Sequence, residues 1–204
     1  MNDVQISDFT SCCVGARPRP SRLQSLVWIH RIGKDAGVNA KEIAHFFIHG
    51  EGSAVTGGNM AYHYIVTLER VEQALPLTQQ GAHARRWGNA HGIGIAVSGD
   101  FRFRPATPKQ WALTVSLCAD LVPFMGRHSA TMFAMLPSAL RHGVPVVGHG
   151  EVPGAYGATS QREQPMGAYA CPGRHWPMHS FRADVSRELA RRAIDRCASL
   201  GHRF

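Results

Sequence analysis

Short apolar runs typical of strands recur along this 204-residue chain, and segments with helix signals separate them. The runs predicted to be strands are residues 26–29, 62–68, 71–77, 92–99 and 144–147. Helices are predicted over residues 39–50, 107–122 and 179–199, with a partly helical stretch over 130–141. Strands that alternate with helices pack as an α/β domain. We therefore expect a single α/β domain over residues 24–204, preceded by an irregular N-terminal arm over residues 1–23.

Composition and charge narrow the class of protein. Apolar residues make up 44% of the chain and charged residues 18%, which excludes a mostly disordered protein. No run approaches the roughly 18 apolar residues of a membrane span, so no membrane insertion is expected. The net charge of +8 suits an anionic partner, but the basic residues are scattered and no nucleic-acid-binding motif accompanies them. We expect a monomer that does not bind nucleic acid.

The N-terminal sequence and the cysteines bear on the compartment. Residues 1–15 lack the basic and apolar regions of a signal peptide, so the chain is expected to be cytoplasmic as synthesised. The cysteines are odd in number and irregularly spaced, which excludes a closed disulfide framework and favours a reduced compartment. They are Cys12, Cys13, Cys118, Cys171 and Cys197.

Histidine is frequent, at 12 of 204 residues, and it is the commonest protein ligand of metals. Two predicted strands end in histidine, at His30 and His149, and Cys171 stands in a turn-forming sequence. Two imidazoles and a thiolate suit Zn²⁺ and leave the fourth position open for water, as catalytic zinc requires. Spacing alone leaves open the alternative of unrelated loop histidines and a small buried cysteine.

A set of short motifs stands in a fixed order along the chain. The motifs are Trp28-Ile29-His30; Ala61-Tyr62-His63-Tyr64-Ile65-Val66; Gly81-Ala82-His83-Ala84 with Asn89 and residues 92–101; Thr107-Pro108-Lys109-Gln110; Val147-Gly148-His149; and Cys171-Pro172-Gly173. Together they resemble the type 2 N-acetylmuramoyl-L-alanine amidases, a family that includes phage lysozyme-like amidases and peptidoglycan recognition proteins. The resemblance covers residues 24 to 190.

The resemblance implies a mixed central β-sheet flanked by helices and a groove that holds one Zn²⁺ ion. It further implies hydrolysis of the amide between N-acetylmuramic acid and L-alanine, with peptidoglycan or muropeptides as the partner. By motif, His30, His149 and Cys171 match the metal ligands and Tyr62 matches the active-site tyrosine. Cys171 favours a catalyst, because family members that only bind peptidoglycan commonly lack this cysteine.

The chain departs from the family pattern near Cys171. Two positions earlier many members carry lysine or threonine to assist the oxyanion, whereas this chain has Tyr169, a second candidate catalytic residue that brings no positive charge. Ala96 stands where the muropeptide-recycling branch has glutamate, so the chain is more similar to the phage and recognition-protein branch. The residues between His149 and Cys171 outnumber those of compact members and are expected to form a loop.

Other residues of the motifs have weaker assignments. His83, Trp87 and Asn89 are candidate substrate-binding residues, with a structural role for His83 and an ordinary surface position for Trp87 as alternatives. His63 adjoins Tyr62, but alternation along a strand directs it to the opposite face, so we expect it to be buried and structural.

The leading functional hypothesis is a zinc-dependent peptidoglycan amidase, with a phage or prophage endolysin as the favoured setting. Such an enzyme would act on the cell wall after release by a route other than general secretion. The alternative is a noncatalytic peptidoglycan-binding module on the same fold, which Tyr169 and the long loop favour.

Overall fold

The computed structural model describes residues 5–12, 18, 26–32, 38–51, 56–125, 143–151 and 171–199. The strands in these residues are β1 (Ile6–Asp8), β2 (Leu26–Arg31), β3 (Tyr64–Val66), β4 (Val71–Gln73), β5 (Gly92–Val97) and β6 (Val146–Gly148). The α-helices are α1 (Ala40–His49), α3 (Arg85–His91), α4 (Pro108–Leu121) and α6 (Met178–Ser199). Short 3₁₀ turns are η1 (Thr10–Cys12), η2 (Val122–Phe124) and η4 (His149–Glu151). The predictions for residues 130–141 and for Tyr169 lie outside the described residues.

The strands form one mixed sheet in the order β1-β4-β3-β5-β2-β6. β2 lies parallel to both β5 and β6, and β3 lies parallel to β5. β3 and β4 are consecutive strands and pair antiparallel. The expected α/β fold with a mixed central sheet is therefore confirmed.

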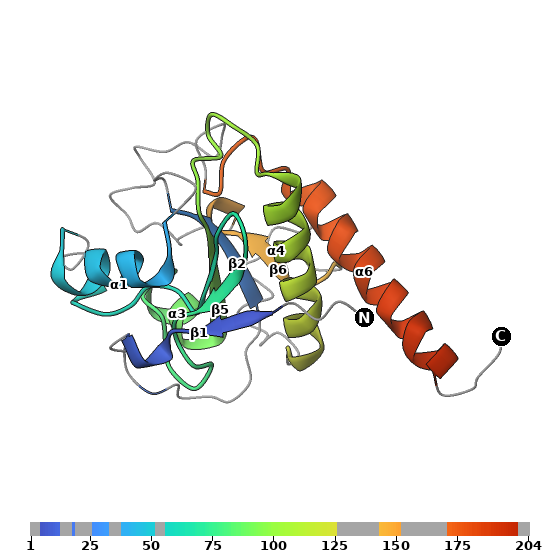
Figure 1. Cartoon of the computed structure of the whole chain (residues 1–204), viewed down its shortest axis with the longest axis horizontal. Helices are drawn as coiled ribbons and strands as arrows, with labels where there is room; N and C mark the ends of the chain where they lie inside the picture. The colour runs from blue at the N-terminus through green and yellow to red at the C-terminus, as the bar shows by residue number, and fades with distance from the viewer. Residues whose placement is uncertain are drawn as a thin grey trace.

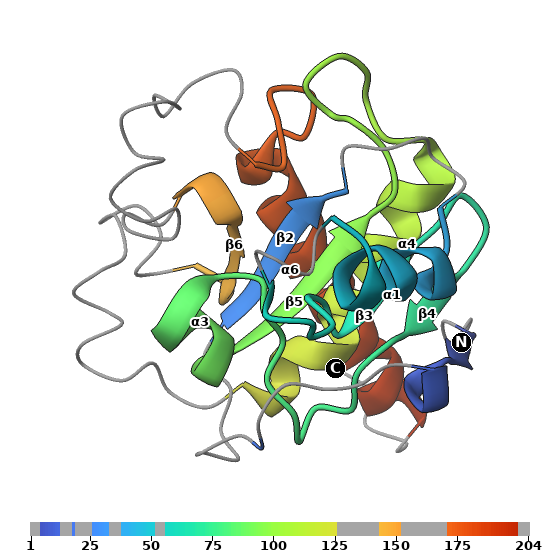
Figure 2. The ribbon, with the colours of Figure 1, turned by 90° about the vertical axis from the view of Figure 1, so that its left-hand side faces the viewer.

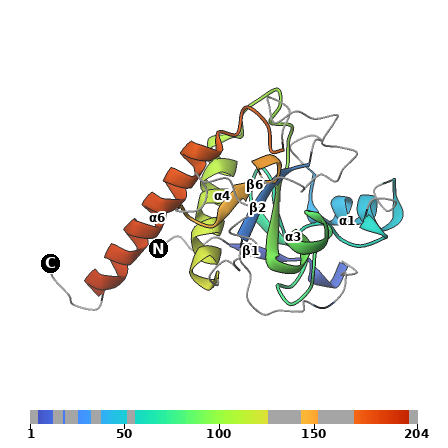
Figure 3. The same cartoon turned by 180° about the vertical axis from the view of Figure 1, so that it is seen from behind.

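Helices cover both faces of this sheet (Figure 1). Seen edge on, the sheet lies between α1 on one side and α4 with α6 on the other, as the opposite view also shows (Figure 3). Side chains alternate between the faces: Ile29 and Ile95 pack in the core beneath α4 and α6, whereas Ile65 and Ala96 pack against α1. His30 follows Ile29 and is paired in register with Ala96, so it faces the side of the sheet that α1 covers. Figure 2 looks onto this side.

Helices α1 and α4 each begin at a capping box. Asn39 accepts a hydrogen bond from the Glu42 N–H, and Glu42 accepts one from the Asn39 N–H, both at 3.0 Å. Thr107 and Gln110 make the same reciprocal pair at the start of α4. These bonds satisfy N–H groups that the first helical turn leaves without a helical partner.

The sequence did not predict β1 and α3. Ile6–Asp8 pairs in parallel with β4, so the expectation of an irregular arm is wrong for these residues. A three-residue strand carries too little local pattern to be recognised, and its pairing partner lies far along the chain. The N-cap of α3 is Ala84, which makes no side-chain capping bond, and the helix contains Gly88, so it lacks the usual start signal.

No helix in the described part of the chain is both long and apolar enough to cross a lipid bilayer.

Candidate metal centre

His30 and His149 leave neighbouring parallel strands at the same level. Val27 pairs with Val146 and Ile29 with Gly148, so the next residue on each strand is one of the two histidines. The two ring centroids lie 4.6 Å apart. Parallel strands present their carboxyl ends at one edge of the sheet, which is where α/β proteins commonly bind ligands.

Cys171 reaches the same edge from the segment that leads into α6. Its carbonyl oxygen accepts a hydrogen bond from the Gly150 N–H at 2.7 Å, and its Sγ accepts one from the Arg31 N–H at 3.3 Å. Gly148 permits this approach, because a Cβ there would lie 3.0 Å from Cδ of Pro172. Cys171 is thus hydrogen-bonded to the last residue of β2 and to the turn that directly follows β6.

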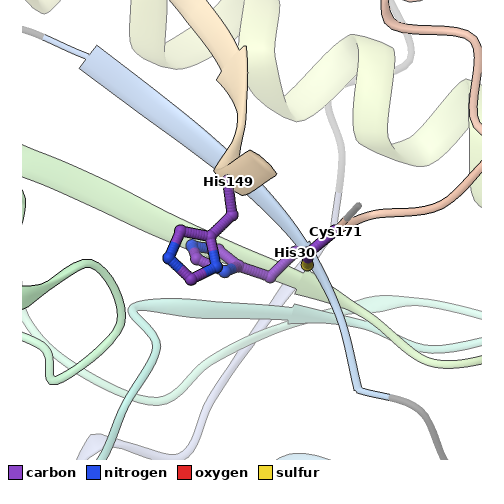
Figure 4. Close-up of side chains that lie close together, drawn as sticks. All are labelled: His30, His149 and Cys171. Carbon is purple, nitrogen blue, oxygen red and sulfur yellow. The ribbon is translucent and has the colours of Figure 1, made fainter. Parts of the chain in front are cut away.

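The three side chains fit a metal ion. Their candidate ligand atoms all lie within 4.8 Å of one another (Figure 4). Ligands of tetrahedral zinc stand roughly 3.3 to 3.6 Å apart, so side-chain shifts on the order of 1 Å would close the site. His30 is 2% exposed, and its Nε2 has no hydrogen-bond partner among the described residues. Because an unpaired buried nitrogen is costly, coordination would satisfy an atom that the rest of the described chain does not.

The protonation state of His30 suits coordination. Burial lowers the pKa of His30 well below its usual range, and the neighbouring His149 and His83 lower it further. The imidazole is therefore neutral at physiological pH, which is the form that coordinates metals.

Tyr62 lies beside the three candidate ligands. Its ring centroid is 5.2 Å from that of His30 and 5.6 Å from that of Phe47 in α1. Burial raises the pKa of Tyr62, and Cys171 raises it further, whereas Arg31 opposes the shift. The phenol thus stays protonated and is a hydrogen-bond donor next to the candidate metal position.

The His83 ring also packs against the His30 ring. The two ring centroids are 5.2 Å apart in an edge-to-face arrangement, and His83 is buried. A Cβ at Gly94 would lie 2.7 Å from the His83 ring, so the glycine leaves the space that this imidazole fills. His83 therefore lies next to a candidate metal ligand. The sequence had indicated only that His83 is a substrate-binding or a structural residue.

Asn89 holds the turn that carries His83. Its Oδ1 accepts hydrogen bonds from the backbone N–H groups of His83 and Ala84, at 2.8 and 2.7 Å. This structural role of the Asn89 oxygen was not predicted from the sequence. Trp87 lies in α3, and its side chain is outside what the structure describes.

His63 is buried and structural, as predicted. Its Nδ1 accepts the Gly94 N–H at 3.0 Å, and its Nε2 lies 3.1 Å from the Gln79 carbonyl oxygen. Since Nδ1 accepts, the bonding pattern assigns the ring proton to Nε2. His63 thereby ties the start of β3 to β5 and to the segment after β4.

Sequence reasoning missed Arg31 and Asp100, which lie beside Cys171. The Arg31 guanidinium contacts the Pro172 carbonyl oxygen and the Asp100 carboxylate. The signal available in the sequence was an arginine directly after a candidate ligand at a strand end. A single charged residue there is too common to single out.

A cavity of about 290 Å³ opens next to this site, on the α1 side. Its lining is mostly apolar, with one carboxylate: Ile32, Val38, Glu42, Ile43, Phe46 and Phe47. Since Phe47 also packs against Tyr62, the cavity adjoins the candidate metal centre.

Comparison with known proteins defines the class. The sequence matches the family described as N-acetylmuramoyl-L-alanine amidase over residues 20–174, which is more than half of its length. The chain therefore belongs to this family, and the resemblance identified from the motifs is confirmed. No curated protein matches the sequence.

Solved structures share the fold. The N-acetylmuramoyl-L-alanine amidase LysC from Clostridium intestinale has a TM-score of 0.61 and 17% identity, covering 89% of this chain and 97% of LysC. The Ph2119 endolysin of a Thermus scotoductus bacteriophage has a TM-score of 0.59 and 19% identity, covering 89% and 99% of the two chains. Human PGRP-IβC, solved with a glycosamyl muramyl pentapeptide, has a TM-score of 0.53 and 16% identity, covering 72% and 85%. At these identities the likeness establishes the fold alone.

Proposed function

We propose that the protein is a zinc-dependent amidase that hydrolyses the bond between N-acetylmuramic acid and the L-alanine of the stem peptide. The observation that carries the proposal is the convergence of His30, His149 and Cys171 at one sheet edge. The family match supports the substrate and the reaction. A thiolate and two neutral imidazoles form the ligand set of a catalytic zinc site with an open fourth position.

Each residue of the site has a separate proposed role. His30, His149 and Cys171 would hold the ion, which when bound lowers the pKa of a ligated water and polarises a carbonyl. Tyr62 donates a hydrogen bond toward the amide oxygen as that oxygen gains negative charge. His83 packs against His30 and holds its ring in place. Tyr169 as a second catalytic group, and substrate contacts by His83, Trp87 and Asn89, stay predictions.

Removing the metal tests the proposal. The purified protein should contain one Zn²⁺ per chain, and a chelator should abolish the release of new alanine amino termini from purified cell walls. Zn²⁺ added back should restore release and raise the unfolding free energy by about 2.7 kcal/mol at a hundredfold excess over Kd. Elemental analysis measures the zinc content, and amine labelling measures the release of amino termini. Undiminished release after metal removal contradicts the proposal, and muropeptide binding without new amino termini would identify the noncatalytic module instead.

Tyr62→Phe should lower kcat by roughly 10²- to 10³-fold, the cost of one lost donor to a developing oxyanion. Metal content should stay at the wild-type level, because Tyr62 is not among the converging ligands. Tyr64→Phe is the matched control, since Tyr64 is buried on the opposite face of the sheet. If Tyr62→Phe hydrolyses cell walls at a rate within twofold of wild type, the Tyr62 hydroxyl has no catalytic role and the residue serves only in packing.

We propose a phage or prophage endolysin as the biological setting, with the enzyme acting on the wall as a monomer. The fold shared with endolysins over 89% of the chain supports this setting. The protein should lower the turbidity of permeabilised cells to which it is added. In size-exclusion chromatography the purified protein should elute as a monomer.

A further inference from the structure

We propose that Arg31 is a positioning residue for the third ligand: its backbone holds the Cys171 sulfur, and its guanidinium clamps the segment that carries it. The inference rests on the proposed zinc site. It explains how a ligand outside the sheet is brought to the two ligands at the strand ends.

The need for such a clamp follows from where the ligands stand. His30 and His149 are placed by neighbouring paired strands. Cys171 stands at the start of the described residues 171–177, which form no helix or strand, so no ladder of strand hydrogen bonds within them places its sulfur. Metal ligands are commonly oriented by outer-shell partners, whose loss costs 10- to 100-fold in metal affinity or activity.

The backbone of Arg31 supplies the first contact. Its N–H donates to Sγ of Cys171 at 3.3 Å. Because Arg31 directly follows His30 on β2, a single strand end carries one ligand and holds another. A hydrogen bond to the sulfur fixes the position of the ligand atom relative to this strand end.

The guanidinium supplies the second contact. Its Nη1 donates to the Pro172 carbonyl oxygen at 3.3 Å, and its Nε lies 3.4 Å from Oδ1 of Asp100. The two charged side chains are only 12% and 18% exposed, so solvent screens the pair less than a surface pair. A guanidinium can serve two acceptors in different directions, whereas an ammonium is a point charge on a flexible stem.

Asp100 is itself anchored. Its carboxylate accepts hydrogen bonds from the Arg102 backbone N–H at 3.1 Å and from Arg102 Nε at 2.8 Å. The same loop packs against the cysteine segment, since the His175 N–H donates to the Phe101 carbonyl oxygen at 2.9 Å. Arg31 therefore joins the end of β2 to a loop and a cysteine segment that are already fastened to each other.

The test compares metal affinity among side-chain variants. Arg31→Met removes the guanidinium but keeps an apolar stem, and it should raise the Kd for Zn²⁺ about 10- to 100-fold in competition with a chelator. In the cobalt-substituted protein, the thiolate-to-cobalt absorption should weaken. Arg31→Lys keeps the charge but cannot make both contacts, so it should show a smaller loss in the same direction. Arg104→Met, an exposed arginine next to the same loop, should match wild type in both measurements.

A second variant tests the route through Asp100. Asp100→Asn should weaken Zn²⁺ binding, and the double variant Arg31→Met/Asp100→Asn should be no worse than Arg31→Met, because the carboxylate acts through the arginine. Additive losses would overturn this route.

The outcomes separate this inference from the proposed function. A wild-type protein that binds no Zn²⁺ overturns both. If wild type binds Zn²⁺ and Arg31→Met has the same Zn²⁺ affinity and cobalt spectrum, the proposal is overturned and Arg31 is merely structural. A lower melting temperature of the metal-free Arg31→Met protein would not change that conclusion. If Arg31→Met does not fold, Arg31→Lys decides: a reduced affinity supports the clamp, and wild-type affinity overturns it.

Discussion

His149→Ala should lose stoichiometric zinc and more than about 100-fold of its wall-hydrolysing activity. The loss of an outer-shell partner alone costs 10- to 100-fold, so the loss of a ligand should exceed that range. His149 is partly buried where β6 ends and is absent from the apolar core, so the variant should still fold. His30 is less suitable, because the rings of Tyr62, His83 and His149 surround it and truncation would open a cavity.

The matched control is His179→Ala. His179 is an exposed histidine in the first turn of α6 and does not belong to the converging group. Its removal should leave zinc content and activity unchanged. A His149→Ala protein that keeps one zinc ion and more than a tenth of wild-type activity would remove His149 from the ligand set.

Gly173→Ala should lower the free energy of unfolding by roughly 2 to 5 kcal/mol, combining backbone strain with overpacking. Gly173 has φ of 131°, where L side chains rarely stand, and a Cβ would lie 2.5 Å from C and O of Phe101. These are backbone atoms, so the clash cannot be relieved by a side-chain rotation. Relief would move the segment that carries Cys171, and Zn²⁺ affinity should fall together with stability.

Urea unfolding measures the first effect and chelator competition the second. Gly143→Ala is the control, because a Cβ at Gly143 meets no atom within 4 Å. Its stability should stay within about 0.5 kcal/mol of wild type. A Gly173→Ala protein with equally unchanged stability would show that the loop and the cysteine segment can separate at little cost.

Local signals account for the parts of the fold that could be predicted. Each capping box joins residues three positions apart, as in Asn39 with Glu42, so the helix start can be read without tertiary information. The apolar runs over residues 26–29 and 92–99 were sufficient to indicate the buried strands β2 and β5, each of which is six residues long. β1 has no comparable local pattern, because its pairing partner β4 lies far along the chain. α3 has none because its N-cap, Ala84, makes no side-chain capping bond.

The candidate site divides in the same way. The order of the motifs identified the family and proposed His30, Tyr62, His149 and Cys171, because residue type and flanking sequence are local properties. His63 is buried and structural as expected, but it precedes β3, so strand alternation does not account for its position. The two backbone N–H groups that the Asn89 oxygen accepts from could not be predicted, because they depend on the conformation of the turn at His83.

By itself, the sequence determined the α/β class, the family and the chemistry of the donor atoms, because composition, periodicity and short motifs are carried by adjacent residues. The tertiary structure decided that two histidines on neighbouring parallel strands and a cysteine 22 positions beyond the second of them converge on one point. It also placed the Arg31 guanidinium in contact with the Pro172 carbonyl oxygen and the Asp100 carboxylate. The physical reason is that strand register and loop packing set distances between residues far apart in the chain, and no local pattern encodes those distances.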